Sequence, residues 1–229
     1  MIRQIIAMGG GGFSMEPGNP LLDQYIVEQA RQPNPRVCFL PHATDDATRY
    51  ALNFYSAFLR LGVRPTHLSL FTPPTADLAS FLMEQDVIYV GGGNTKSMIA
   101  LWREWGLDII LRDAYFSGVV LAGISAGANC WFEQCSTDSI PGPYTMMRCL
   151  GLLSGSFCPH YNGEPLRRPS YLEMVDSGAM LPGYAADDGA AIHMVNEVPF
   201  LCVGSRPSSL VYRVSPGSEV ALSTQYLKS

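Results

Sequence analysis

A serine in a glycine-rich turn is the first residue of this chain that could do chemistry. Residues 123–127 read Gly-Ile-Ser-Ala-Gly and follow the apolar stretch 119–122. Glycines two positions before and after a serine at the end of a strand are typical of a nucleophile elbow, a sharp strand-to-helix turn that exposes the hydroxyl. The amide of Ala126 would then lie at a helix amino terminus, where it can donate to an oxyanion. Ser125 is therefore the predicted nucleophile, and the alternative is a glycine turn in which it only caps the helix.

A second glycine-rich loop, residues 91–94 with the sequence Gly-Gly-Gly-Asn, follows another apolar stretch. Consecutive glycines let backbone N–H groups approach a ligand closely. The carboxyl ends of parallel strands share one edge of a sheet, so we expect this loop and the Ser125 turn to face the same crevice. Gly92 or Gly93 is the predicted second donor to the oxyanion, and a phosphate-binding or plain tight turn is the alternative.

Four histidines could supply the general base that a serine nucleophile requires. His160 is the favoured candidate, because it follows the serine in the chain as the base does in elbow-type hydrolases. His42, at the end of a predicted strand, is its rival. His193 lies in an alternating segment, which is typical of a structural residue.

Two carboxylates lie between the serine and the histidine and could orient the base. Asp138, in a Thr-Asp-Ser turn, is preferred because a turn can fold back toward the base. Glu133 would lie roughly two turns along an uninterrupted helix from Ser125, but it stays open as an alternative. Asp187 and Asp188 are more distant reserves.

The sequence predicts neither a metal nor a cofactor. Cys130 and Cys135 lack the C-x₂-C spacing of a zinc ribbon, and no paired histidine or cysteine set accompanies them. Residues 9–12, all glycine, superficially resemble a dinucleotide loop. They lack the G-x-G-x-x-G spacing, and the second predicted strand ends in Leu-Pro-His rather than in an acidic residue.

Apolar segments of strand length alternate with segments of helical length, which predicts an α/β fold with a mostly parallel sheet flanked by helices. Strands are expected at residues 2–8, 36–40, 63–70, 87–90 and 119–122, and helices at 21–31, 47–61, 76–84, 95–105 and 109–117. Further on, residues 150–157 have a strand's apolar content, 167–178 are typical of a helix, and 183–214 alternate like antiparallel strands. No repeat or low-complexity linker interrupts the chain, so we expect one domain over residues 1–229.

The composition argues against several other classes of protein. With 47% hydrophobic and 15% charged residues, the chain has the material for a core and not for a disordered protein. A net charge of −5 argues against general nucleic-acid binding, which needs a basic face. No 18 apolar residues run together, no cleavage site follows the apolar N-terminus, and the six cysteines are scattered. We therefore expect a cytoplasmic protein with reduced thiols that binds neither nucleic acid nor membrane.

Three separated segments together resemble one family. Residues 89–95 (Tyr-Val-Gly-Gly-Gly-Asn-Thr), 123–129 (Gly-Ile-Ser-Ala-Gly-Ala-Asn) and 158–161 (Cys-Pro-His-Tyr) are similar to the signature blocks of the dipeptidase E and cyanophycinase family of serine peptidases. The resemblance spans nearly the whole chain and implies a glutamine-amidotransferase-like α/β sheet with serine in place of that class's cysteine. It also implies Ser125 as nucleophile, His160 as base, and an acid at Asp138 or, as in related members, at Glu133.

The same segments contain the predicted substrate-binding residues, which are Asn94, Asn129 and Tyr161. The family's best-known activity removes N-terminal aspartate from dipeptides, and this needs a cation at the substrate carboxylate. The arginines available for that role are Arg148, Arg167, Arg168 and Arg206. The resemblance further implies that two copies of the chain can pair as a homodimer.

The predicted function is that of a cofactor-independent serine peptidase that hydrolyses short peptides through an acyl-enzyme. Two other functions stay open. One is a non-catalytic protein that binds a small anion at the glycine-rich strand ends. The other is an esterase or amidase that acts on non-peptide acyl groups with the same catalytic groups.

Overall fold

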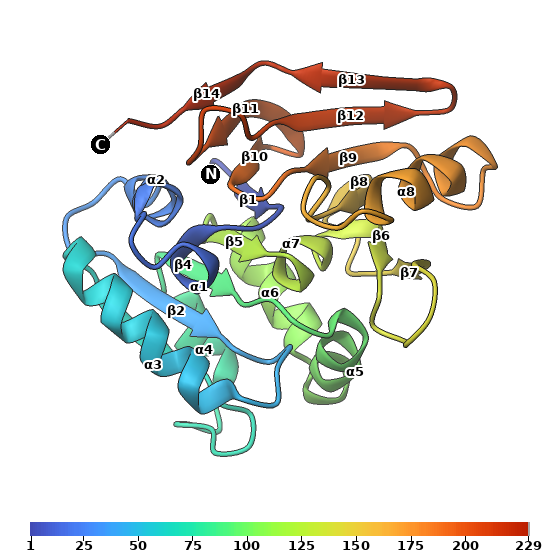
Figure 1. The fold of residues 1–229 in the computed structure, drawn as a ribbon. Coiled ribbons are helices and arrows are strands. Elements are labelled where there is room, and N and C mark those ends of the chain that lie inside the picture. Colours follow the sequence, from blue (N-terminus) through green and yellow to red (C-terminus); the bar gives the residue numbers. More distant parts are fainter. Residues whose placement is uncertain (229) are drawn as a thin grey trace.

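Two mixed β-sheets form the framework of the protein in the computed structural model, which describes residues 1–228 (Figure 1). The larger sheet has the strand order β14-β11-β10-β1-β5-β4-β2-β3. Its strands are β1 (Gln4–Met8), β2 (Arg36–Leu40), β3 (Arg64–His67), β4 (Val87–Val90), β5 (Val120–Ile124), β10 (Ala190–Val195), β11 (Val198–Gly204) and β14 (Thr224–Tyr226). Strands β1, β5, β4, β2 and β3 are parallel, while β10 is antiparallel to β1 and to β11. The predicted α/β fold is confirmed.

Helices cover both faces of this sheet, because its central strands are apolar on both sides (Figure 1). Ile6 and Met8 pack toward the first three helices, and Ile5 and Ala7 pack toward the next three. The first group is α1 (Gly12–Met15), α2 (Leu21–Glu28) and α3 (Ala47–Phe58); the second is α4 (Leu78–Met83), α5 (Thr95–Trp105) and α6 (Leu107–Phe116). A 3₁₀ turn, η1 (Leu59–Leu61), extends α3 to the end of the helix expected over residues 47–61. Gly62 follows with a φ of 70°, the left-handed conformation in which a glycine commonly ends a helix.

The second sheet begins just after the short helix α7 (Ala126–Asn129) and has the order β13-β12-β9-β8-β6-β7. Its strands are β6 (Phe132–Thr137), β7 (Thr145–Arg148), β8 (Leu153–Cys158), β9 (Gly183–Ala186), β12 (Val211–Ser215) and β13 (Ser218–Leu222). Helix α8 (Arg167–Asp176) packs against it through Tyr171 and Val175. The sequence did not predict β6 and β7. The hydrophobic core reaches across both sheets, and the prediction of one domain stays a prediction.

Strand β5 lies between β1 and β4, and this order places three loops around one point. The parallel register pairs Met8 with Ile124 and Val90 with Gly123, so the three strands end at the same edge. The glycine loops at 9–12 and 91–94 therefore flank Ser125, the residue that follows β5.

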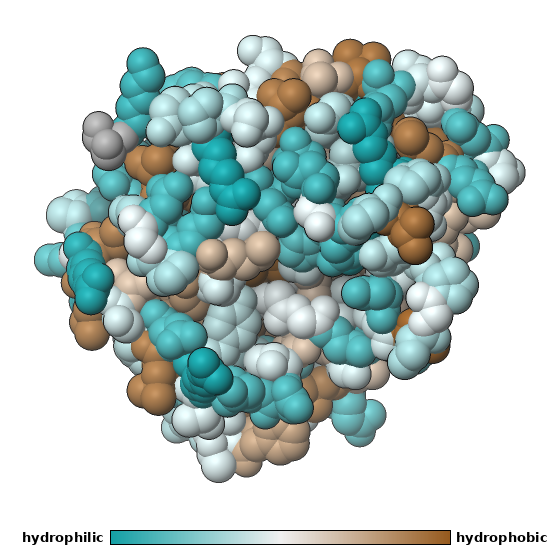
Figure 2. Space-filling model, viewed as in Figure 1, coloured by the Kyte–Doolittle hydropathy of each residue, from teal (hydrophilic) through white to brown (hydrophobic). Residues whose placement is uncertain are grey.

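The outer surface has no single dominant character on the face drawn in Figure 2. Hydrophilic residues cover most of it, and hydrophobic residues occur in small separate groups. Among residues 1–228, none of the helices combines the length and the apolar composition needed to cross a bilayer.

Candidate active site

Ser125 adopts the strained backbone of a sharp strand-to-helix turn, with φ 54° and ψ −113°. The glycines on either side are required by close packing. A Cβ on Gly123 would stand 2.0 Å from the carbonyl oxygen of Gly127, and a Cβ on Gly127 would stand 2.2 Å from that of Val90. The Ser125 amide donates to the Met8 carbonyl and fixes the turn to β1. The serine is therefore held at the sheet edge in the conformation that the sequence pattern predicts.

His160 follows β8 and lies against the loop that ends β1. Its backbone amide donates to the Gly9 carbonyl at 3.2 Å, and its φ is 52°. Its Nδ1 lies 2.6 Å from Asp188 Oδ1, in a pair whose side chains are only 15% and 16% exposed. Because an ionised aspartate can only accept, Nδ1 carries the proton and Nε2 is left as the acceptor.

Several neighbours leave room for this pair and hold Asp188 in place. A Cβ on Gly10 would stand 2.0 Å from Asp188 Oδ1, and one on Gly163 would stand 2.4 Å from Oδ2. The Asp188 amide donates to Asn162, and its carbonyl accepts from the Ser209 hydroxyl at 2.6 Å. The first glycine loop thus permits the close approach of a histidine and a carboxylate, a role that the sequence did not reveal.

Ser125 and His160 line one open pocket of about 410 Å³, to which Gly93, Asn94, Asp138, Ser139, Glu164 and Arg167 also contribute. Within the part of the chain that the structure describes, no hydrogen bond joins the serine hydroxyl to His160. Such bonds often tighten only when substrate binds. A nucleophile, a base with a free acceptor nitrogen and an orienting carboxylate are therefore gathered in one hollow.

The two carboxylates that the sequence favoured do not reach His160. Asp138 lines the pocket, but its Oδ2 faces Arg167 NH2 at 3.8 Å, and its side chain is 61% exposed. Glu133 is exposed in β6 and accepts a hydrogen bond from the Gly155 amide at 2.7 Å. Both carboxylates were selected from the sequence because they lie between Ser125 and His160 in the chain. The carboxylate that contacts His160 comes from the turn before β10 and is Asp188, one of the two more distant reserves.

The amides of the second glycine loop have different partners. Gly92 N–H, one of the two expected oxyanion donors, donates to the Tyr50 hydroxyl at 3.2 Å. Gly93 N–H has no acceptor among residues 1–228, and neither has Ala126 N–H, at the start of α7. Gly93 and Ala126 thus keep the free amides that an oxyanion hole needs, whereas Gly92 does not.

The three predicted substrate-binding residues have different positions. Asn94 lines the pocket, where its Oδ1 accepts from the Ser97 amide and its Nδ2 donates to the Ser139 carbonyl. Asn129 is 2% exposed behind the turn, and its side-chain Nδ2 donates to the Thr95 hydroxyl at 3.5 Å. Tyr161 is buried and donates its hydroxyl to Glu219. Only Asn94 faces the site, because neighbouring positions in a turn or strand point to different sides.

The rival histidines are buried in other environments. His42 accepts from the Trp102 indole at 2.9 Å through Nδ1, and its Nε2 lies 2.9 Å from the Leu68 carbonyl. Burial lowers the pKa of His42 to about 4, and it does the same for His193, whose Nδ1 meets the Tyr25 hydroxyl at 2.7 Å. Both rings are neutral structural residues. Within residues 1–228, no three histidine, cysteine or acidic side chains are grouped to hold a metal ion.

A buried cation lies at the wall of the pocket. Arg167 is 3% exposed, and its NH2 pairs with Glu164 at 2.7 Å. Its guanidinium also stacks on the Tyr144 ring at 4.3 Å. Of the four arginines that the sequence offered for a substrate carboxylate, Arg167 is the one that lines this pocket, and Glu164 and Asp138 offset its charge.

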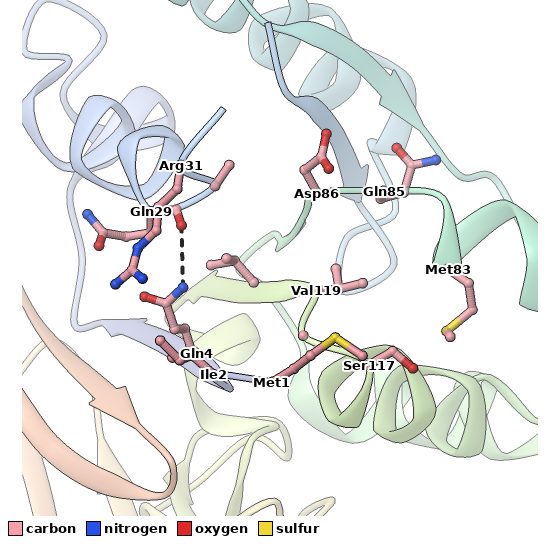
Figure 3. A pocket seen from close by; sticks show the side chains of 13 residues that line it. Met1, Ile2, Gln4, Gln29, Arg31, Met83, Gln85, Asp86, Ser117 and Val119 are labelled. Atoms are coloured by element: carbon pink, nitrogen blue, oxygen red, sulfur yellow. Dashed lines mark hydrogen bonds between the residues drawn. The ribbon is translucent and has the colours of Figure 1, made fainter. Parts of the chain in front are cut away.

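A second hollow, of about 380 Å³, opens at the opposite edge of the larger sheet, where β1, β4 and β5 begin (Figure 3). Gln4, Gln29 and Gln85 are among the residues that line it, and Gln4 Nε2 donates to the Gln29 carbonyl at 3.3 Å. Its lining includes Ser117 but no histidine, so it lacks the nucleophile and base that the first pocket brings together.

The chain is similar in sequence to known peptidases. The model of peptidase family S51 matches residues 5–200. YgaJ, an uncharacterized peptidase of Bacillus subtilis (strain 168), is 56% identical over 230 residues, which cover 99% of this chain and 100% of YgaJ. Peptidase E of Actinobacillus pleuropneumoniae serotype 5b (strain L20) is 26% identical over 189 residues, with 78% of each chain covered.

Two solved structures share the fold at low sequence identity. A peptidase from an acI-B1 actinobacterium superposes with a TM-score of 0.69 at 16% identity, covering 97% of this chain and 98% of that one. A putative peptidase E from Listeria monocytogenes EGD-e superposes with a TM-score of 0.65 at 20% identity, covering 94% and 100%.

Proposed function

Because this chain belongs to peptidase family S51 and is a serine-type peptidase, we propose that it hydrolyses short peptides through a triad of Ser125, His160 and Asp188. The observation that carries the proposal is the 2.6 Å contact between His160 Nδ1 and Asp188 Oδ1, in the pocket that Ser125 also lines. A strained serine and a carboxylate-oriented histidine at one sheet edge are the parts that acyl transfer requires.

The reaction follows from the roles of the two ring nitrogens. Asp188 holds Nδ1–H, so Nε2 takes the proton of the Ser125 hydroxyl as its oxygen attacks the peptide carbonyl. His160 then gives this proton to the departing amine. Water enters and loses a proton to the same nitrogen as its oxygen attacks the acyl carbonyl. His160 then returns this proton to the Ser125 oxygen as the ester bond breaks, which releases the acid and restores the serine.

The developing oxyanion needs donors whose hydrogen bonds are not already used. The amides of Ala126 and Gly93 meet this condition, and Ala126 also lies at the start of a helix. We assign both to the oxyanion hole, and we assign Asn94 to the pocket wall that contacts the substrate.

The size and charge of the pocket guide the choice of substrates. A hollow of about 410 Å³ suits a short peptide better than a folded protein. Arg167 could meet a substrate carboxylate, yet Glu164 pairs with it already. The substrate panel should therefore compare dipeptides that begin with aspartate, with neutral residues and with lysine at equal concentrations.

A fluorophosphonate probe gives the first test, because it labels only an activated serine. Wild-type protein should be labelled, and Ser125→Ala should not be labelled and should lose turnover by on the order of 10⁴-fold or more while staying folded. Labelling without peptide hydrolysis would favour an esterase or amidase. Absence of labelling in the wild type would favour a non-catalytic anion-binding protein and overturn the proposal.

The carboxylate is tested separately. Asp188→Asn should lower kcat by about 10⁴-fold, since the amide no longer holds the required tautomer of His160. Glu133→Gln is the matched control, because the Glu133 carboxylate accepts from the Gly155 amide away from the pocket lining, so the change should leave turnover unchanged. Equal activity of wild type and Asp188→Asn would reject Asp188 as the triad carboxylate.

A homodimer stays a further proposal, which light scattering after size exclusion would decide.

A further inference from the structure

The loop from Gly91 to Asn94 is anchored at three of its four amides. Gly91 N–H donates to the Leu40 carbonyl at 3.1 Å, and Asn94 N–H donates to the Ala43 carbonyl at 2.7 Å. Both partners are backbone atoms: Leu40 is the last residue of β2, and Ala43 lies in the segment that follows it. The anchor of Gly92 is different, because its amide donates to a side chain, the Tyr50 hydroxyl of α3, at 3.2 Å.

This loop lies directly against the nucleophile. A Cβ on Gly92 would stand 3.3 Å from Ser125 Cβ and 3.9 Å from its Oγ. Gly93 has φ 134°, and a Cβ there would stand 2.2 Å from the Ala43 carbonyl oxygen, so its backbone has no room to shift in that direction. The peptide that carries the free Gly93 amide is thus held between an anchor at Gly92 and an anchor at Asn94.

Tyr50 is itself rigidly placed. Its ring packs edge-to-face on Phe39 at 4.9 Å and lies 5.5 Å from the ring of Phe13. A Cβ on Gly91 would stand 2.7 Å from Tyr50 Cε1, so Gly91 packs closely against the ring. Burial raises the pKa of the hydroxyl above its ordinary value, which keeps it neutral. An acceptor fixed by packing can orient a flexible glycine peptide at little entropic cost.

We propose that Tyr50 is a positioning residue for peptide hydrolysis: by holding the Gly92 amide, its hydroxyl orients the next peptide so that Gly93 N–H serves the oxyanion. The inference rests on the proposed function and deepens it. It also explains why only one amide of the triple glycine is left for the transition state, since the loop uses the others to fix its own shape.

The test is Tyr50→Phe, which keeps the packed ring and removes the acceptor. We expect kcat to fall by about 10–100-fold with KM little changed, because loss of a whole oxyanion donor typically costs about 10²–10³-fold and this change only loosens one. Affinity for a peptide aldehyde, whose adduct places an oxyanion in the hole, should fall by a similar factor. Amide hydrogen exchange over residues 91–94 should become faster, and this readout does not depend on turnover.

Tyr55→Phe is the matched control. Tyr55 lies on the same helix, and its hydroxyl meets His67 Nδ1 at 2.9 Å rather than the glycine loop. This variant should lose a comparable hydrogen bond without any change in kcat or in exchange over residues 91–94.

The outcomes separate this inference from the proposed function. A wild type that neither hydrolyses peptides nor reacts with fluorophosphonate overturns both. If an active wild type and Tyr50→Phe share the same kcat, aldehyde affinity and exchange over residues 91–94, the inference is rejected and the proposed function stands. A rise in KM at constant kcat also rejects it, since that result assigns Tyr50 to substrate binding.

Discussion

Replacing Asp23 by asparagine should remove a pH dependence of folding that this carboxyl imposes between about pH 4 and pH 7. Asp23 lies on α2 and is only 1% exposed. A Cβ on Gly12 would stand 2.9 Å from its Oδ1 and 3.0 Å from the Tyr89 hydroxyl, so the two polar groups converge beneath the first glycine loop. Burial raises the pKa of Asp23 from 3.8 to about 7, although hydrogen bonds with Tyr89 and the Phe13 backbone lower it and the charge of Glu16 raises it further.

The direction of the pH dependence follows from which state of the protein, folded or unfolded, binds the Asp23 proton more tightly. In the unfolded chain the carboxyl ionises near 3.8, whereas in the folded protein it stays protonated until about pH 7. Between these values the folded state holds the extra proton, so the free energy of unfolding falls as the pH rises and levels off above about pH 7. A tenfold change in proton affinity corresponds to about 1.4 kcal/mol, and the whole effect is therefore about 4 kcal/mol.

The assay is urea unfolding followed by tryptophan fluorescence for wild type and Asp23→Asn at several pH values from 4 to 8. Contributions of other carboxyl groups cancel in the difference between the two proteins. The variant should gain about 4 kcal/mol relative to wild type across this range. Asp77→Asn is the control: Asp77 is an exposed helix cap whose pKa the Ser80 amide lowers, so its difference from wild type should be flat above pH 5. A flat difference for Asp23→Asn would refute the reasoning.

Two further changes test the site and the core. Gly10→Ala places a Cβ 2.0 Å from Asp188 Oδ1, so the carboxylate must leave His160. We therefore expect kcat to fall at least about 100-fold. Gly18→Ala, which has open space around its Cβ, is the control and should behave as wild type in the same kinetic assay. Phe54→Ala should cost about 3–5 kcal/mol in urea unfolding, because Phe54 is fully buried and stacks on Phe39 at 4.8 Å. If Phe54→Ala lowers the free energy of unfolding no more than a substitution at an exposed position does, the reasoning about the packed core is contradicted.

The sequence revealed the parts of the site that depend on neighbours along the chain. The turn at Ser125 needs Gly123 and Gly127 within two residues on either side, and the structure shows the close contacts that demand them. The helix expected over residues 47–61 is also local: α3 and η1 together cover these residues, and Gly62 with positive φ follows them. Patterns of neighbouring residues therefore placed the loop that carries the serine and most of the elements of the larger sheet, but not β6 and β7.

Contacts between distant segments were beyond such rules. Asp188 meets His160 because β10 pairs with β1 and a parallel bridge joins Gly10 to Asp188. Asp138 was favoured by its place in the chain, its turn and the family resemblance, and the structure directs it toward Arg167. The role of Tyr50 was likewise hidden, because a tyrosine on an amphipathic helix gives no sign of the loop that it will contact.

The pairing of β1 with β10 has a consequence for the stage of synthesis at which the site can assemble. During synthesis β1 leaves the ribosome before the serine turn, and β10, the strand after Asp188, leaves it after both. His160 therefore has no carboxylate partner until most of the polypeptide is available. With the proposed role of Asp188, a chain that lacks the segment around β10 is expected to be inert.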